Sequence, residues 1–192
     1  MATTQPIRKK EELQALKNYY LNEKPNLRNY ALIITGINTA LRIGDTLQLR
    51  WCDVYDDTTG SFRPHIVMRE HKTGKENIIA MNQNVIHALT KYRDSLSDPQ
   101  PSHFIFCGWH PEAPLSRYQA FRIIKQASHV LHLHGNIACH SLRKTFGYHA
   151  WASGANSVIL MQIYNHSSFR VTKRYLGIEQ DDKDQVFLKI KL

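Results

Sequence analysis

Residues 140–150, HSLRKTFGYHA, carry a histidine and an arginine three positions apart on a segment with the pattern of a helix. Residues with this spacing are neighbours on a helix, with about 5–6 Å between their Cβ atoms. His140 and Arg143 can therefore point at one small object. That object could be a carboxylate in the protein's own core or a phosphate group of another molecule. The other reactive residues of the chain have to show which of the two is meant.

A second segment, residues 164–177, combines a histidine, two serines, several cations and a tyrosine. His166 precedes a Ser-Ser pair, whose hydroxyls are suited to cap the start of a helix. Tyr175 follows nine residues later and is preceded by two basic residues. A tyrosine there can simply pack against the core. A phenol near cations is also a candidate nucleophile, because a base or positive charge can overcome its ordinary pKa of about 10.

Two further candidates lie earlier in the chain. Arg42 stands at the end of the most apolar helical run, where a charged guanidinium is costly unless it is paired. Asp45, three residues later, is one such partner. Residues 71–75, HKTGK, form the turn of a predicted hairpin and carry Lys72 and Lys75. Turn lysines are usually solvated, and this segment is not a Walker A loop, since no Ser or Thr follows Gly-Lys.

A cluster of histidines raises the question of a metal. Its members are His129, His132, His134 and His140, with Cys139 beside the last of them. The spacing matches neither paired Cys-x-x-Cys motifs nor His-Glu-x-x-His, and no carboxylate lies among these residues. We therefore predict no metal site. A metal-dependent nuclease built on these histidines is the alternative, and EDTA would abolish its activity.

The order of these motifs resembles the catalytic domain of the tyrosine recombinase (phage integrase) family. The four segments are TALRIGD at 39–45, HKTG at 71–74, HSLRKTF at 140–146 and NHSSFRVTKRY at 165–175. The resemblance extends from Arg8 to Ile178. It implies one active site made of Arg42, Lys72, His140, Arg143, His166 and the nucleophile Tyr175.

The sequence departs from the commonest family pattern at two positions. Lys144 stands where family members often have histidine, and Asn165 stands where they often have glycine. Neither change removes a residue of the implied site, and asparagine tolerates the left-handed backbone better than most residues. Lys72 is preferred to Lys75 as the catalytic lysine because it directly precedes Thr-Gly.

The resemblance implies that DNA strands are cut and rejoined through a 3′-phosphotyrosine, without a metal, a cofactor or ATP. The residue types suit this chemistry independently. Arg42 and Arg143 can each donate paired hydrogen bonds to a phosphate whose charge grows in the transition state. Lys72 can protonate the leaving 5′-oxygen. His140 can accept or hold the phenol proton, and His166 can donate to a phosphate oxygen.

Other residues are expected to support the site or to contact DNA. Asp45 is predicted to hold Arg42 in place. The net charge of +9 favours a polyanionic partner, most simply nucleic acid. Candidate DNA contacts are Lys75, Arg117, Arg122, Lys125, Lys144, Lys173 and Arg174. Arg117, Arg122 and Lys125 share one face of a predicted helix. That face could contact DNA, or it could equally well be an ordinary solvent-exposed surface.

Helical patterns cover most of the chain, and one β-hairpin interrupts them. The expected helices lie at 7–23, 27–51 with a break at Gly44, 83–96, 116–133, 140–150, 156–165 and 168–177, and the hairpin joins 62–70 to 76–82. We therefore predict an α+β, mainly helical fold of the DNA breaking-rejoining type. One catalytic domain spans 1–177, with a small antiparallel sheet on one side.

The tail, residues 178–192, has Val186, Phe187 and Ile190 on one stripe. It could fold back on its own domain or pack on a neighbouring protomer. Arg42 comes too early to leave room for the N-terminal core-binding domain of many family members, so we expect a short form or a fragment of a longer integrase. The resemblance further implies four protomers on double-stranded DNA at specific sites, with accessory DNA-bending proteins.

Location and rival functions follow from the remaining features. No apolar run reaches the roughly 18 residues of a membrane span, and the start has no apolar signal-peptide core. Three widely spaced cysteines suit a reducing compartment. We expect a cytoplasmic protein, associated with the nucleoid when it binds DNA. A type IB topoisomerase-like DNA relaxase and an inactive DNA-binding relative are the alternatives within the same fold.

Overall fold

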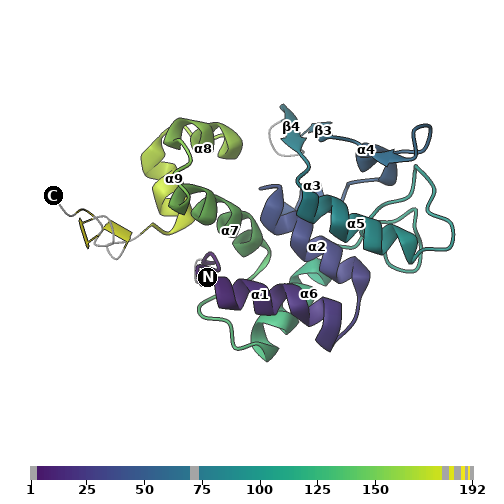
Figure 1. The fold of residues 1–192 in the computed structure, drawn as a ribbon, viewed down its shortest axis with the longest axis horizontal. Coiled ribbons are helices and arrows are strands. Elements are labelled where there is room, and N and C mark those ends of the chain that lie inside the picture. Colours follow the sequence, from purple (N-terminus) through teal and green to yellow (C-terminus); the bar gives the residue numbers. More distant parts are fainter. Residues whose placement is uncertain (1–3, 70–73, 179–181, 184–186, 189, 191–192) are drawn as a thin grey trace.

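The computed structural model describes residues 4–69, 74–178, 182–183, 187–188 and 190, most of them in helices (Figure 1). The helices are α1 Lys10–Asn18, the π-helical turn η1 Tyr19–Glu23, α2 Leu27–Asn38, α3 Ile43–Thr46, α4 Trp51–Val54, α5 Gln83–Asp94, α6 Arg117–Val130, α7 Cys139–Ala152, α8 Ser157–Tyr164 and α9 Phe169–Leu176. The predicted mainly helical α+β architecture is confirmed.

The predicted hairpin is present, and a second, smaller one accompanies it. Strands β3 His65–Arg69 and β4 Glu76–Ala80 pair antiparallel, with the register running from His65 opposite Ala80 to Arg69 opposite Glu76. Strands β1 Tyr55–Asp56 and β2 Ser61–Phe62 enclose the polar turn between them. The described residues thus contain two small two-stranded sheets rather than the single one predicted.

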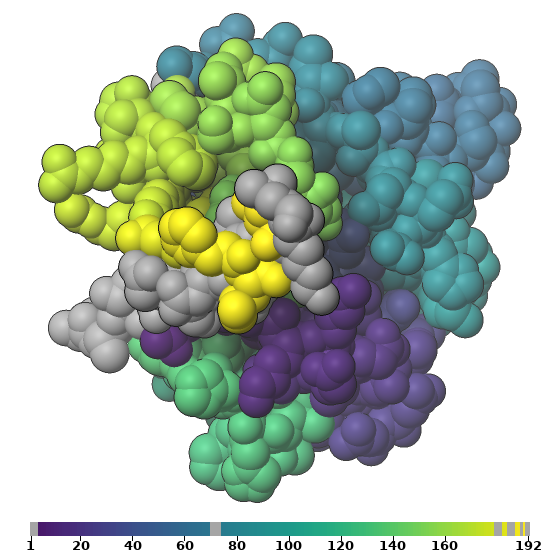
Figure 2. Space-filling model, turned by 60° about the vertical axis from the view of Figure 1, so that its left-hand side comes forward, coloured from purple at the N-terminus to yellow at the C-terminus, as the bar shows by residue number. Residues whose placement is uncertain are grey.

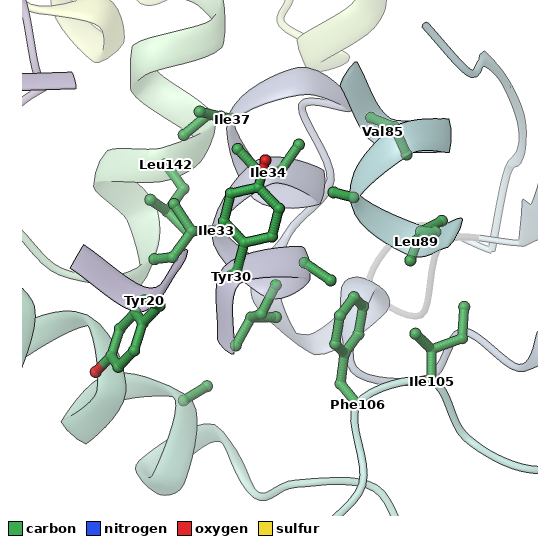
Figure 3. Close-up of a cluster of buried hydrophobic side chains, with 14 of the residues drawn as sticks. Tyr20, Tyr30, Ile33, Ile34, Ile37, Val85, Leu89, Ile105, Phe106 and Leu142 are labelled. Atoms are coloured by element: carbon green, nitrogen blue, oxygen red, sulfur yellow. The ribbon is translucent and has the colours of Figure 1, made fainter. Parts of the chain in front are cut away.

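Helix α2 forms the centre of the main hydrophobic core. Its cap residue Asn26 accepts a hydrogen bond from the backbone N–H of Asn29, at 3.0 Å, which satisfies a free donor at the helix start. Figure 3 shows α2 between α5, which contributes Val85 and Leu89, and α7, which contributes Leu142. Because both flanks of α2 are covered, its side chains are apolar almost all round.

The break after α2 lies at Ala40, so the predicted break at Gly44 is wrong. Helix α2 ends at Asn38, Ala40 adopts a left-handed φ of 55°, and Gly44 lies inside α3. Non-glycine residues rarely adopt positive φ unless the surroundings impose it. Here the guanidinium of Arg143 donates a hydrogen bond to the Ala40 carbonyl. Arg42 therefore directly precedes α3 instead of ending the apolar helix.

A smaller hydrophobic cluster joins α7, α8 and α9. Tyr164 and Leu176 are its buried centre, and the ring of Tyr175 packs against it. Gly147 on α7 makes this approach close, because a Cβ there would lie 2.5 Å from the Tyr164 hydroxyl and would also collide with Leu176. The helix that carries Tyr175 thus lies directly on the helix that carries Arg143.

Figure 2 views the side from which the tail emerges, with its described residues in yellow in front of α9 and the N-terminal helix, and Figure 1 shows that they extend outward from the end of α9. Asp182 is buried, accepts a hydrogen bond from the Tyr148 hydroxyl at 3.0 Å and lies 3.5 Å from the guanidinium of Arg8. Phe187 and Ile190 are exposed, whereas Val186 lies outside the described residues. The start of the tail therefore folds back on its own domain.

None of the helices in the described part of the chain has the length and apolar character needed to cross a membrane.

Candidate functional site

Arg143 lies at the centre of the candidate site. Helix α7 carries it on its buried side, where the side chain is only 4% exposed. Its guanidinium donates to the carbonyl of Ala40 and lies 4.6 Å from the centre of the Tyr164 ring. Ala40 lies in the left-handed turn two residues before Arg42. The contact between Arg143 and Ala40 therefore brings α7 next to the start of α3.

Tyr175, near the end of α9, faces this arginine. Its ring centre lies 5.4 Å from that of Tyr164 and 5.3 Å from that of His166. Burial raises the pKa of Tyr175, while the charge of Arg143, a hydrogen bond from its guanidinium and the charge of Arg42 oppose this rise. Two guanidinium groups far apart in the chain therefore act on one phenol.

His166 completes this group. It follows Asn165, which ends α8 in the left-handed conformation with φ of 54°, so the asparagine takes the role that glycine has at such a turn. Burial lowers the pKa of His166, and the charges of Arg143 and Arg42 lower it further. The imidazole is therefore mainly neutral at pH 7.

Thr172 is a site residue that the sequence analysis missed. It is fully buried on α9, and its hydroxyl lies 3.0 Å from Nδ1 of His166. A threonine inside a basic amphipathic helix gives no sign of such a role, because its partner lies in the turn before the helix. The same hydroxyl also lies 3.4 Å from the Ser168 carbonyl, and when it donates to the nearer Nδ1 instead, the ring proton stands on Nε2, which can then donate to a ligand.

His140 lies in the first turn of α7, one turn before Arg143, and its side chain is exposed. Lys72 lies outside the described residues, so its catalytic role stays a prediction. Lys75 is described and exposed, and its ammonium donates to Oδ1 of Asn165 at 2.9 Å. The turn of the β3–β4 hairpin thus reaches the residue next to His166.

Asp45 is 3% exposed and lies in the short helix that follows Arg42. Its backbone N–H donates to the Arg42 carbonyl at 2.9 Å. That its carboxylate holds the Arg42 guanidinium stays a prediction.

Six of the seven candidate DNA contacts have side chains that are exposed or partly exposed, Lys75 among them. Arg117 and Arg122 on α6 are exposed, and a Cβ on Gly44 would lie 2.7 Å from the Arg117 guanidinium, so Arg117 lies beside α3. Lys125 is half-buried and donates to Oδ1 of Asn136 at 2.7 Å. On α9, Arg174 is exposed and Lys173 is half-buried.

Lys144 is the exception. It is 5% exposed, and its ammonium donates to the backbone carbonyl of Thr4 at 2.6 Å. It also lies 5.1 Å from the centre of the Tyr175 ring. This inward placement does not fit the expected DNA contact, because the neighbouring helices and the N-terminal segment cover the side chain.

Two other tyrosines near the site are engaged in structural hydrogen bonds. Tyr164 is 1% exposed, its hydroxyl donates to the Arg143 carbonyl at 2.7 Å, and burial raises its pKa. The Tyr148 hydroxyl donates to Asp182. Among the described residues, no group of three or more His, Cys, Asp or Glu side chains is placed to hold a metal ion.

Comparisons with known proteins identify related sequences and folds. Residues 7–181 match the model of the phage integrase family. The probable integrase/recombinase YoeC of Bacillus subtilis (strain 168) is 38% identical over 181 residues, which cover 94% of this chain and 93% of YoeC. Against several XerC and XerD tyrosine recombinases, the chain spans only about half of the relative's length, for example 52% and 56%.

Solved structures share the fold. The crystal structure of XerA recombinase superposes with a TM-score of 0.78 at 19% identity, covering all of this chain and 68% of XerA. XerH site-specific recombinase, in a post-cleavage complex with its palindromic difH substrate, gives a TM-score of 0.73 at 16% identity and covers 97% of this chain and 53% of XerH.

Proposed function

Because the chain belongs to the phage integrase family of tyrosine recombinases, we propose that it cuts and rejoins DNA through a covalent bond between Tyr175 and a 3′-phosphate. The observation that carries this proposal is the meeting of two guanidinium charges and one phenol. Arg143 donates a hydrogen bond to Tyr175, and Arg42 adds its charge. Such a cluster is suited to hold a phosphate diester against a nucleophile.

The two arginines supply the electrostatic part of the reaction. In the pentavalent transition state, negative charge spreads over the non-bridging oxygens of the phosphate. Arg143 is held rigidly by the Ala40 carbonyl and by its burial, so its remaining N–H groups are oriented before the substrate arrives. With fixed positive charge from Arg42 and Arg143, the reaction does not require a metal ion.

The phenol needs help to attack, because burial raises its pKa. We propose that His140, one turn from Arg143 on α7, accepts or holds the phenol proton as the Tyr175 oxygen bonds to phosphorus. The bond from phosphorus to the 5′-oxygen breaks at the same time, and a hairpin lysine donates a proton to that oxygen. Lys72 is the first candidate for this lysine and Lys75 the second. The phosphotyrosine conserves the energy of the original bond, so rejoining needs no ATP.

His166 is proposed to donate a hydrogen bond from Nε2 to a phosphate oxygen. Its other nitrogen is held by the Thr172 hydroxyl at 3.0 Å. Replacing Thr172 by valine keeps the shape of the side chain but releases the imidazole. Since one hydrogen bond is worth about 1 kcal/mol, we expect the rate of strand cleavage to fall roughly fivefold to tenfold.

Single-turnover cleavage assays check this expectation, with Thr172→Ser as the matched control because serine keeps the hydroxyl. The serine variant should cleave at nearly the wild-type rate. Equal rates for the valine variant and the wild type would show that Thr172 does not orient His166.

DNA is the proposed partner. The net charge of +9 and the exposed side chains of Arg117, Arg122 and Arg174 suit contacts with DNA phosphates. We further propose that four protomers assemble on two specific sites, with help from accessory DNA-bending proteins. Phe187 and Leu188 are 76% and 77% exposed, and an apolar pair of this kind could pack on a neighbouring protomer.

The proposal is tested with a pool of nicked duplexes whose sequence is randomised around the nick, incubated with the protein in EDTA. A nick beside the cleavage site lets the short product diffuse away, so the covalent intermediate accumulates. We expect an SDS-resistant protein–DNA adduct whose recovered DNA shares a common sequence. Adduct formation that requires a divalent metal, or no adduct with either the pool or DNA of the source genome, would overturn the proposal. Adducts without a common sequence would indicate a topoisomerase-like relaxase.

A further inference from the structure

Residues 4–8 form a strap that runs along α7 and reaches the end of α9. The backbone N–H of Ile7 donates to the hydroxyl of Thr145 on α7 at 2.9 Å, and the Ile7 carbonyl lies 2.9 Å from Nε2 of His149. The guanidinium of Arg8 donates to the carbonyl of Gly177, which directly follows α9. The strap therefore contacts both the helix that carries Arg143 and the end of the helix that carries Tyr175.

Lys144 connects this strap to the nucleophile. Its ammonium donates to the Thr4 carbonyl at 2.6 Å and lies 5.1 Å from the centre of the Tyr175 ring. The side chain is 5% exposed, and burial lowers the pKa of its ammonium. A buried charge is costly unless it is compensated, and here a carbonyl oxygen and the face of an aromatic ring compensate it.

We propose that Lys144 is a positioning residue for Tyr175, which it fixes against the strap and whose ionised form it favours. This inference rests on the proposed function, since it concerns the nucleophile of that reaction. A cation beside a phenol stabilises the phenolate more than the neutral phenol. A neutral side chain at position 144 would pack in the same space without this effect.

Several charged or titratable groups surround Tyr175, and their contributions have to be separated. They are Arg143 and Lys144 on α7, Arg42 before α3, Tyr164 at the end of α8 and His166 before α9, together with His140 on α7, the proposed acceptor of the phenol proton. His166 is mainly neutral above pH 7, because burial lowers its pKa. Removing the charge at position 144 should therefore raise the pKa of Tyr175 without changing the other charges around it.

The test is the pH dependence of single-turnover cleavage for Lys144→Met, measured from about pH 6 to about pH 10. Because the phenol then ionises less readily, the rising limb of the profile should move to higher pH by roughly one unit. This corresponds to a roughly tenfold lower rate on that limb. Lys144→Arg keeps the charge and should keep the wild-type limb. Lys91→Met, on the exposed end of α5, is the matched control and should change nothing.

Lys144→Gln separates the charge from the hydrogen bond, because its amide can still donate to the Thr4 carbonyl. It also provides a second neutral variant in case the methionine variant does not fold. A glutamine profile shifted to higher pH supports the inference. A profile that keeps the wild-type limb, with rates lowered equally at every pH, would show a purely structural role and overturn it. If the proposed function itself is wrong, the wild-type protein will form no adduct, which distinguishes that failure from failure of the Lys144 inference.

Discussion

Replacing Tyr175 by phenylalanine removes the covalent protein–DNA adduct while leaving DNA binding almost unchanged. The substitution deletes only the hydroxyl, whose oxygen is the proposed nucleophile, and the ring can keep its contacts with Tyr164 and His166. Loss of the nucleophile should lower cleavage by at least about 10⁴-fold. Gel analysis of nicked substrates after denaturation measures the adduct, and a filter-binding assay measures the affinity.

Tyr164→Phe and Tyr148→Phe are the matched controls. Each removes a hydroxyl that makes a structural hydrogen bond, to the Arg143 carbonyl and to Asp182 respectively. We expect each to lower stability by about 1 kcal/mol and to keep the adduct. If the adduct persists in Tyr175→Phe and disappears in one of these controls, Tyr175 is not the nucleophile.

Replacing Arg143 by lysine should lower cleavage on the order of 10²- to 10³-fold. The ammonium keeps the charge, but it cannot donate to the Ala40 carbonyl and also present paired N–H groups to a phosphate. Arg143→Ala should lower cleavage further. It should also destabilise the fold by about 1–3 kcal/mol, because it leaves the buried Ala40 carbonyl without its donor.

Single-turnover cleavage and thermal unfolding, measured side by side, separate the two effects of Arg143. Arg63→Lys, an exposed position between β2 and β3, is the control and should retain cleavage. A lysine variant of Arg143 that cleaves within about threefold of the wild type, a difference of less than 1 kcal/mol, would contradict the assignment of transition-state contacts to its guanidinium.

Four of the six residues that the sequence motifs predict for the site lie near one another, and their catalytic roles stay predictions. Arg42, Arg143, His166 and Tyr175 were predicted as one group, and the charges and contacts around Tyr175 bring these four together. The relative positions of residues within one helix or across a short turn are set by local structure, so they can be predicted without knowledge of the fold. The position of Arg42 relative to α7 required the family resemblance, because nothing local relates segments a hundred residues apart.

Features that depend on distant contacts could not be predicted. Lys144 was expected on the DNA-binding surface because lysines are usually solvated. Its partner Thr4 lies 140 positions away and acts through a backbone carbonyl, which carries no sequence signal. The break at Ala40 was missed for a similar reason, since glycine normally marks a helix break and the carbonyl of Ala40 is held by Arg143.

The proposed function depends on one bond, which joins the phenol oxygen beside the two guanidinium groups to DNA. Nuclease and protease digestion of the adduct, followed by mass spectrometry, locates the residue that carries the nucleotide. We predict the modification on Tyr175, in the segment that follows His166. A nucleotide attached to Tyr164, to Tyr148 or to any residue outside α9 would contradict the account.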